Sequence, residues 1–220
     1  MWDKLLLGNS SFPLCIGLAV LLQLRERLLD SEFNDCILLF SDLPAVDIER
    51  CVKDSIRLFC TTPKSLVYRK YGGEEDENWL LAEDDPLSIK SITLKEQKTE
   101  KLPRMSGEEL RQLLTAEGKA KVVVVDVRPA DEYKLGALSG SLHVPYSADG
   151  LDDAATLDRL KAEKRGKVIC VAGGGGEGGA REAREVAERL LALGLTRLCV
   201  LHNGVDAFRA VPGMLHVPNA

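Results

Sequence analysis

The chain has 220 residues, of which 45% are hydrophobic and 29% charged, and its formal net charge is −5. This is the composition of a folded globular protein, and it excludes collagen-like and wholly disordered chains. Acidic residues (34) outnumber basic ones (29), and the sequence has no basic stripe that could neutralise phosphates, so nucleic-acid binding is not expected. Because one core organises about 100–150 residues, we predict two structural units.

The six cysteines are widely spaced, with no C-x-x-C pair and no histidine cluster that would form a zinc site. Most of them lie in apolar runs, which is typical of reduced, buried cysteines in a cytoplasmic protein. The apolar run 12–22 is too short to span a bilayer, which needs about 20 apolar residues. We therefore expect no metal site, no transmembrane segment and a cytoplasmic location.

Apolar residues recur at helical spacing from residue 13 to residue 60 and predict three helices. The first carries an apolar stripe formed by Ile16, Val20, Leu21, Leu24 and Leu28. Two more helices are expected at about 33–40 and about 46–59. Three short helices bury too little apolar surface to be stable alone, so we expect residues 1–70 to be an incomplete part of a larger helical domain.

Residues 71–101 contain two acidic runs, 72–77 and 83–86, followed by a mixed charged stretch. This composition predicts a charged, mobile linker between the two units. The alternative is a short docking motif at the Trp-Leu-Leu segment 79–81, which lies among acidic residues.

From residue 102 to residue 220 the pattern alternates between helices and strands. Ser106 and Glu109 have the spacing of a capping box, which opens a helix that extends to about Leu114. Apolar and β-branched runs predict strands, separated by helices at 152–161 and 180–193; the strands are expected at 122–125, 141–144, 168–172 and 197–201. The alternation predicts a mostly parallel sheet with helices on both faces and a ligand crevice at the carboxyl ends of the strands.

A glycine-rich segment follows the strand at 168–172. It consists of Gly173, Gly174, Gly175, Gly176, Glu177, Gly178 and Gly179. Its backbone N–H groups could form a concavity that binds an anion, and a flexible tight turn without a ligand is the alternative. The glycine spacing also fits a dinucleotide fingerprint, although the acidic residue expected about 20 positions later is absent. A mononucleotide-binding domain that uses residues 173–179 is therefore one alternative function.

Several features of residues 105–212 follow the order and spacing of one known family. They are Asp126-Val127-Arg128 at a strand end, Glu132-Tyr133, Leu142-His143-Val144-Pro145 and the segment 201–208. This arrangement resembles the rhodanese-like fold, in which a strand-end cysteine precedes a loop whose N–H groups stabilise a persulfide or another anion. The resemblance implies that fold for residues 102–220. It also implies that residues 172–179 form the active-site loop, supported by Asp126, Arg128 and Glu132.

Two residues depart from the family's pattern. Ala172 stands where the nucleophilic cysteine belongs, and an alanine cannot form a persulfide. Glu177 stands near the place where related loops carry an arginine, and its charge opposes a bound anion. We therefore predict a degenerate active-site loop in a non-catalytic domain without a cofactor. The alternative is an active sulfurtransferase that uses Cys170, two residues earlier on the same strand face.

Arg128 is predicted to tie the strand end to Glu132 or to the loop, rather than to form a catalytic pair with Asp126.

The helical residues 1–70 also resemble a known fold. The segments that carry this resemblance are 2–8, 14–29 and 35–43, which are similar to the end of a TBC domain, the fold of Rab GTPase-activating proteins. A TBC end, an acidic linker and a rhodanese-like domain together resemble the carboxyl-terminal part of a family in which a kinase-like domain precedes the TBC domain. That family is associated with Rab-dependent endosomal trafficking. The resemblance implies Rab GTPases or trafficking-complex subunits as partners, and association with endosomes.

TBC catalysis uses an arginine finger and a glutamine finger that lie earlier in the domain. Asp47 and Arg50 match only half of the first finger motif, and no tyrosine is followed two residues later by glutamine. We therefore expect neither GTPase-activating finger in this chain.

Overall fold

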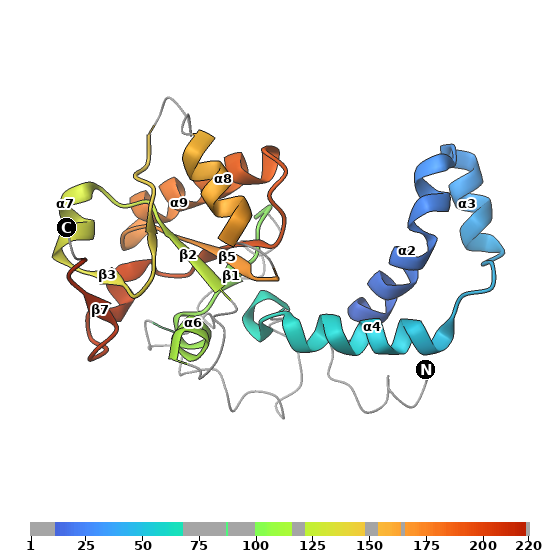
Figure 1. Cartoon of the computed structure of the whole chain (residues 1–220), viewed down its shortest axis with the longest axis horizontal. Coiled ribbons are helices and arrows are strands. Elements are labelled where there is room, and N and C mark those ends of the chain that lie inside the picture. Colours follow the sequence, from blue (N-terminus) through green and yellow to red (C-terminus); the bar gives the residue numbers. More distant parts are fainter. Residues whose placement is uncertain are drawn as a thin grey trace. The chain divides into compact units, whose positions relative to one another are not determined.

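The computed structural model describes residues 12–67, 87, 100–115, 122–147, 154–163 and 166–218 (Figure 1). The chain divides into two compact units, Met1–Pro63 and Lys64–Ala220. The domain boundaries expected near residues 70 and 102 stay predictions, because most of the predicted linker lies outside the described residues.

The described residues of the first unit form three helices, α2 (Phe12–Asp30), α3 (Phe33–Ser41) and α4 (Ile48–Thr61), as predicted from apolar periodicity. Helix α2 packs along α4, where the amide of Gln23 donates a hydrogen bond to the carbonyl oxygen of Asp47 at 2.9 Å. The ring of Phe12 in α2 meets the ring of Phe59 in α4 edge to face, with 5.4 Å between centroids.

Much of the apolar surface of this unit is exposed. Phe33 is 80% exposed, Leu38 65% and Leu29 64%, and Leu21, which belongs to the predicted apolar stripe, is 42% exposed. One stripe of α2, around Ile16, faces α4, and among the described residues the leucines and phenylalanine named above stay exposed. An exposed apolar surface of this kind is expected of part of a larger helical domain.

The second unit contains a parallel five-stranded sheet in the order β1-β6-β5-β2-β4. Its strands are β1 (Arg104–Met105), β2 (Val122–Asp126), β4 (Leu142–His143), β5 (Val168–Ala172) and β6 (Leu198–Leu201). The four longer predicted segments are confirmed within a few residues. An antiparallel ribbon pairs β3 (Ala137–Leu138) with β7 (Leu215–His216). This ribbon and strand β1 were not predicted, because such short strands carry no periodicity.

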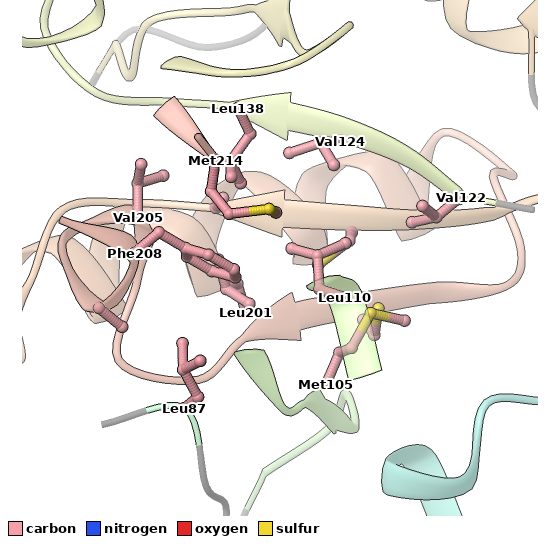
Figure 2. Packing of buried hydrophobic residues seen from close by; sticks show 14 of the residues in the cluster. Leu87, Met105, Leu110, Val122, Val124, Leu138, Leu201, Val205, Phe208 and Met214 are labelled. Atoms are coloured by element: carbon pink, nitrogen blue, oxygen red, sulfur yellow. The ribbon is translucent and has the colours of Figure 1, made fainter. Parts of the chain in front are cut away.

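Helices cover both faces of the sheet, as predicted. Helix α6 (Gly107–Thr115) and the 3-10 turn η3 (Val205–Phe208) contribute to the core on one face, which Figure 2 shows. Helices α8 (Ala154–Glu163) and α9 (Gly176–Ala192) contribute to the core on the other face. Two further helical elements are described, α7 (Ala130–Leu135), which follows β2, and the 3-10 turn η1 (Lys64–Val67).

The amino terminus of α6 is capped differently from the predicted capping box. The hydroxyl of Ser106 accepts a hydrogen bond from the N–H of Glu109 at 3.1 Å, as predicted. The Glu109 carboxylate, however, accepts from the backbone N–H of Ser65 at 2.7 Å and from the Ser65 hydroxyl. The Ser65 hydroxyl oxygen in turn accepts from the N–H of Ser106 at 3.2 Å. Ser65 thus bridges Ser106 and Glu109 by hydrogen bonds. No local sequence pattern could indicate this bridge.

Candidate functional site

The glycine-rich segment leaves the carboxyl end of β5, an interior strand of the sheet, where the topology predicts a ligand crevice. Helix α9 begins at Gly176, four residues earlier than predicted, and Gly175 is its N-cap residue. The loop therefore comprises only residues 173–175, and residues 176–179 form the first turn of α9. The prediction was wrong because glycine has a low helix propensity, which the packing of α9 on β5 and β6 overrides here.

Two of the glycines are required by close approach of the backbone. A Cβ atom on Gly173 would lie 2.1 Å from the carbonyl oxygen of Gly179, and one on Gly179 would lie 2.3 Å from the carbonyl oxygen of Gly174. A Cβ on Gly178 would meet open space. The loop is therefore a tight turn packed directly against the first turn of α9.

The other side of the loop is held by η3, which follows β6. The backbone N–H of Val205 donates to the carbonyl oxygen of Gly173 at 2.9 Å. The Oδ2 atom of Asp206 accepts from the N–H of Gly175 at 2.7 Å, and its Oδ1 atom accepts from Nε of Arg209 at 2.7 Å. A loop N–H group that a rhodanese-like site would use for an anion is thus already bound to a carboxylate of the chain itself.

The charge state of Asp206 follows from its surroundings. Burial raises its pKa, but the hydrogen bonds from Gly175 and Arg209 and the nearby charges of Arg209 and Arg128 outweigh burial, so the pKa of Asp206 lies below its usual value. Asp206 is therefore ionised at neutral pH and occupies the loop as an anion.

A second carboxylate lies close to the loop. The Oε2 atom of Glu132 is 3.6 Å, and the Oδ2 atom of Asp206 is 3.9 Å, from the point where a Cβ on Gly174 would be. Glu177 is exposed in the first turn of α9, where the positive end of the helix favours an acidic side chain. The carboxylate that contacts the loop is therefore Asp206, which sequence reasoning did not single out, whereas the predicted adverse charge of Glu177 lies exposed on α9.

Asp126 and Arg128 form a buried pair behind the loop, with side chains 0% and 2% exposed. Asp126 accepts from the backbone N–H of Arg128 at 3.1 Å and from its Nη2 at 2.7 Å, and Nη2 also donates to the carbonyl oxygen of Gly136 at 2.8 Å. The ring of His143 is stacked on the ring of Tyr133, and its Nε2 atom lies 2.9 Å from the carbonyl oxygen of Arg128.

The hydrogen bonds of Arg128 thus reach Asp126 and Gly136 rather than Glu132, because Asp126 lies only two residues away at the same strand end. The pair holds the end of β2 in place.

Cys170 and Ala172 are fully buried in the core shown in Figure 2, on the face opposite Ile169 and Val171. Cys170 is in register with Cys199 on β6. Burial raises the pKa of the Cys199 thiol well above its usual value, so this neighbour is a neutral thiol. Cys170 itself is 0% exposed, so its sulfur has no accessible surface from which to attack a substrate.

In the described part of the chain, no three His, Cys, Asp or Glu side chains gather into a group that could hold a metal ion. None of the helices among these residues is both long and apolar enough to cross a membrane. The possible docking motif at 79–81 lies outside the described residues.

The rhodanese-like domain family matches residues 106–211. Over its whole length the chain is 40% identical, across 253 aligned residues, to the TBC domain-containing protein kinase-like protein of Homo sapiens. The chain spans only 28% of the length of that relative.

Among solved structures, a protein from Bacillus halodurans is 29% identical with a TM-score of 0.36, and the match covers 46% of this chain and 66% of that one. A rhodanese-like domain from Anabaena is 21% identical with a TM-score of 0.37, covering 50% of this chain and 74% of the other. Residues 106–211 match the rhodanese-like domain family, and the chain is similar over its whole length to part of the TBC domain-containing protein kinase-like proteins.

Proposed function

We propose that the rhodanese-like domain is a non-catalytic protein-interaction module within a protein that regulates Rab GTPases in endosomal trafficking. The observation that carries the first half is the side chain at the end of β5. The side chain of Ala172 is a methyl group, which cannot form a covalent intermediate, and it is fully buried. The similarity to proteins named for a TBC domain supports the second half.

The charge around the loop also favours an interaction module. The N–H of Gly175 already donates a hydrogen bond to the carboxylate of Asp206, so a persulfide or phosphate would have to displace this carboxylate to bind the same N–H. Together with Glu132, Asp206 makes the loop unfavourable for anions and favourable for the basic side chains of a partner protein. Rab GTPases and subunits of trafficking complexes are the proposed partners.

The chain's own residues do not supply a GTPase-activating finger in this proposal. Arg50 matches the partial finger motif, and its side chain is 71% exposed and lies 3.8 Å from Asp54 across one turn of α4. An exposed pair of this kind is an ordinary feature of a helix surface. We assign any Rab-activating residues to the parts of the relatives that this chain does not span.

Wild-type protein is expected to form no thiocyanate from thiosulfate and cyanide above the blank rate, because neither Ala172 nor the buried Cys170 can carry the sulfur. The measurement is a colorimetric thiocyanate assay on the full chain, with an active sulfurtransferase as positive control. Cys170→Ser and Cys199→Ser are matched variants, since each removes one buried thiol of the same pair. Turnover that is lost in Cys170→Ser but kept in Cys199→Ser would overturn the non-catalytic assignment.

A further inference from the structure

Leu87 is part of the domain core although it lies in the segment predicted to be a linker. Its side chain is 6% exposed and belongs to the cluster of buried side chains that contains Phe208 and Val205 (Figure 2). Its carbonyl oxygen accepts a hydrogen bond from the N–H of Glu108 in the first turn of α6 at 3.3 Å. A Cβ on Gly107 would lie 2.5 Å from Cδ2 of Leu87, so the start of α6 is shaped to admit this side chain.

The same cluster is connected to the glycine loop through η3. Val205 and Phe208, the first and last residues of η3, are fully buried in it. The backbone of η3 is also fastened to the loop, since the N–H of Val205 donates to Gly173 and the carboxylate of Asp206 accepts from Gly175. Because cores are close-packed, η3 cannot move away from the cluster without pulling on both of these hydrogen bonds.

A third contact makes this connection tight. Gly204, directly before η3, has a φ of +67°, and a Cβ there would lie 2.4 Å from the carbonyl oxygen of Gly174. The chain that leaves β6 thus lies against the loop with no space between the two backbones. A change in the position of η3 would therefore be transmitted to the loop rather than absorbed by a gap.

We propose that Leu87, η3 and the glycine loop form one conformational device, in which docking of Leu87 and the bond of Asp206 to Gly175 stabilise each other. Such coupling is reciprocal: release of Leu87 weakens the bond between Asp206 and Gly175, and a ligand that displaces Asp206 from the loop weakens the docking of Leu87. The device controls the conformation of the glycine loop. Only its biological role rests on the proposed function, which assigns partner binding to this loop.

Two backbone amides report on the two ends of the device. The N–H of Glu108 is bonded to Leu87, and the N–H of Gly175 is bonded to Asp206. Hydrogen exchange of the full chain, followed by NMR, measures both, and the amide of Ile169 in β5, bonded to the carbonyl oxygen of Arg197, monitors global opening.

Leu87→Ala is expected to speed exchange at both Glu108 and Gly175 by at least about fivefold relative to Ile169. Leu160→Ala is the matched control, because it truncates a fully buried leucine in the core on the opposite face of the sheet. It should leave the ratio of the Gly175 rate to the Ile169 rate within about twofold of wild type, as expected of a purely global loss of stability. Faster exchange at Glu108 alone in Leu87→Ala would overturn the coupling.

The reciprocal variant is Asp206→Ala, which is expected to speed exchange at Glu108. If Leu87→Ala does not fold, this variant tests the coupling by itself. Its matched control is Glu177→Ala, which also removes one carboxylate near the loop but leaves η3 intact. Equal Glu108 rates in these two variants would contradict the proposal. None of these measurements involves sulfur transfer or a partner, so their outcome is separate from that of the proposed function.

Discussion

Gly173→Ala is expected to destabilise the rhodanese-like domain by roughly 3 kcal/mol or more, whereas Gly178→Ala should leave it unchanged or stabilise it by up to about 1 kcal/mol. The difference comes from the surroundings, because a Cβ on Gly173 would lie 2.1 Å from the backbone oxygen of Gly179, and one on Gly178 would meet nothing within 4 Å. Gly178 also lies in the first turn of α9, where alanine is the better helix former. Urea unfolding followed by circular dichroism measures both changes.

A third variant tests the same contact from the opposite side. Gly179→Ala should destabilise about as much as Gly173→Ala, because its Cβ would lie 2.3 Å from the carbonyl oxygen of Gly174. In both cases the obstacle is backbone rather than the movable end of a side chain. Equal unfolding midpoints for Gly173→Ala and Gly178→Ala would show that the loop is not packed against the first turn of α9.

Arg128→Met is expected to cost about 3–5 kcal/mol, because it leaves the carboxylate of Asp126 buried without its counter-charge. The pair is 2% and 0% exposed, and Arg128 also donates to the carbonyl oxygen of Gly136. Arg159→Met is the matched control: it removes an arginine whose pair with Glu163, at 3.2 Å, has side chains 66% and 39% exposed. That loss should be below about 1 kcal/mol.

Thermal unfolding of the full chain measures both arginine variants. The double variant Asp126→Asn/Arg128→Met should be more stable than Arg128→Met alone, because it removes the buried charge that the single change leaves unpaired. A loss in Arg128→Met no greater than that in Arg159→Met would mean that the buried pair does not hold the end of β2.

The longer elements could be predicted because their signals are local. The β-branched run that becomes β2 and the apolar run that becomes β5 are continuous, as expected of strands buried on both faces. The alternation of strands and helices was sufficient to predict a parallel sheet with two covered faces. Strands β1, β3 and β7 were missed, because each is a two-residue segment that pairs with a distant neighbour; β4 is equally short, but it lies within the predicted segment 141–144.

The candidate site was predictable only in part. The position of the loop follows from the topology, the burial of Cys170 and Ala172 follows from the continuous apolar run of β5, and strand alternation places both on one face. The bond from Gly175 to Asp206 joins residues 31 positions apart, and it depends on β6 lying parallel beside β5. One signal could have drawn attention to Asp206, since it follows a predicted strand that ends at the same edge of the sheet.

The anchors at the start of α6 carried no signal in the sequence at all. Ser65 completes a cap whose other members are 41 and 44 residues away, and Leu87 is buried although it lies in a segment of acidic composition. Composition describes the average of a segment, and it cannot identify one side chain that packs into a distant core.

Rebuilding the loop tests most directly the proposal that the domain is non-catalytic because the nucleophile is missing and the carboxylate of Asp206 binds the loop. Ala172→Cys alone is expected to form little thiocyanate, and Ala172→Cys/Asp206→Ala at least about tenfold more, since one freed donor at an oxyanion contributes about 10²–10³ in rate. Asp206→Ala alone should form none, and Ala172→Cys/Asp206→Asn separates the charge from the hydrogen bond to Gly175. Ala172→Cys with the same turnover as Ala172→Cys/Asp206→Ala, both proteins being folded by circular dichroism, would contradict this explanation.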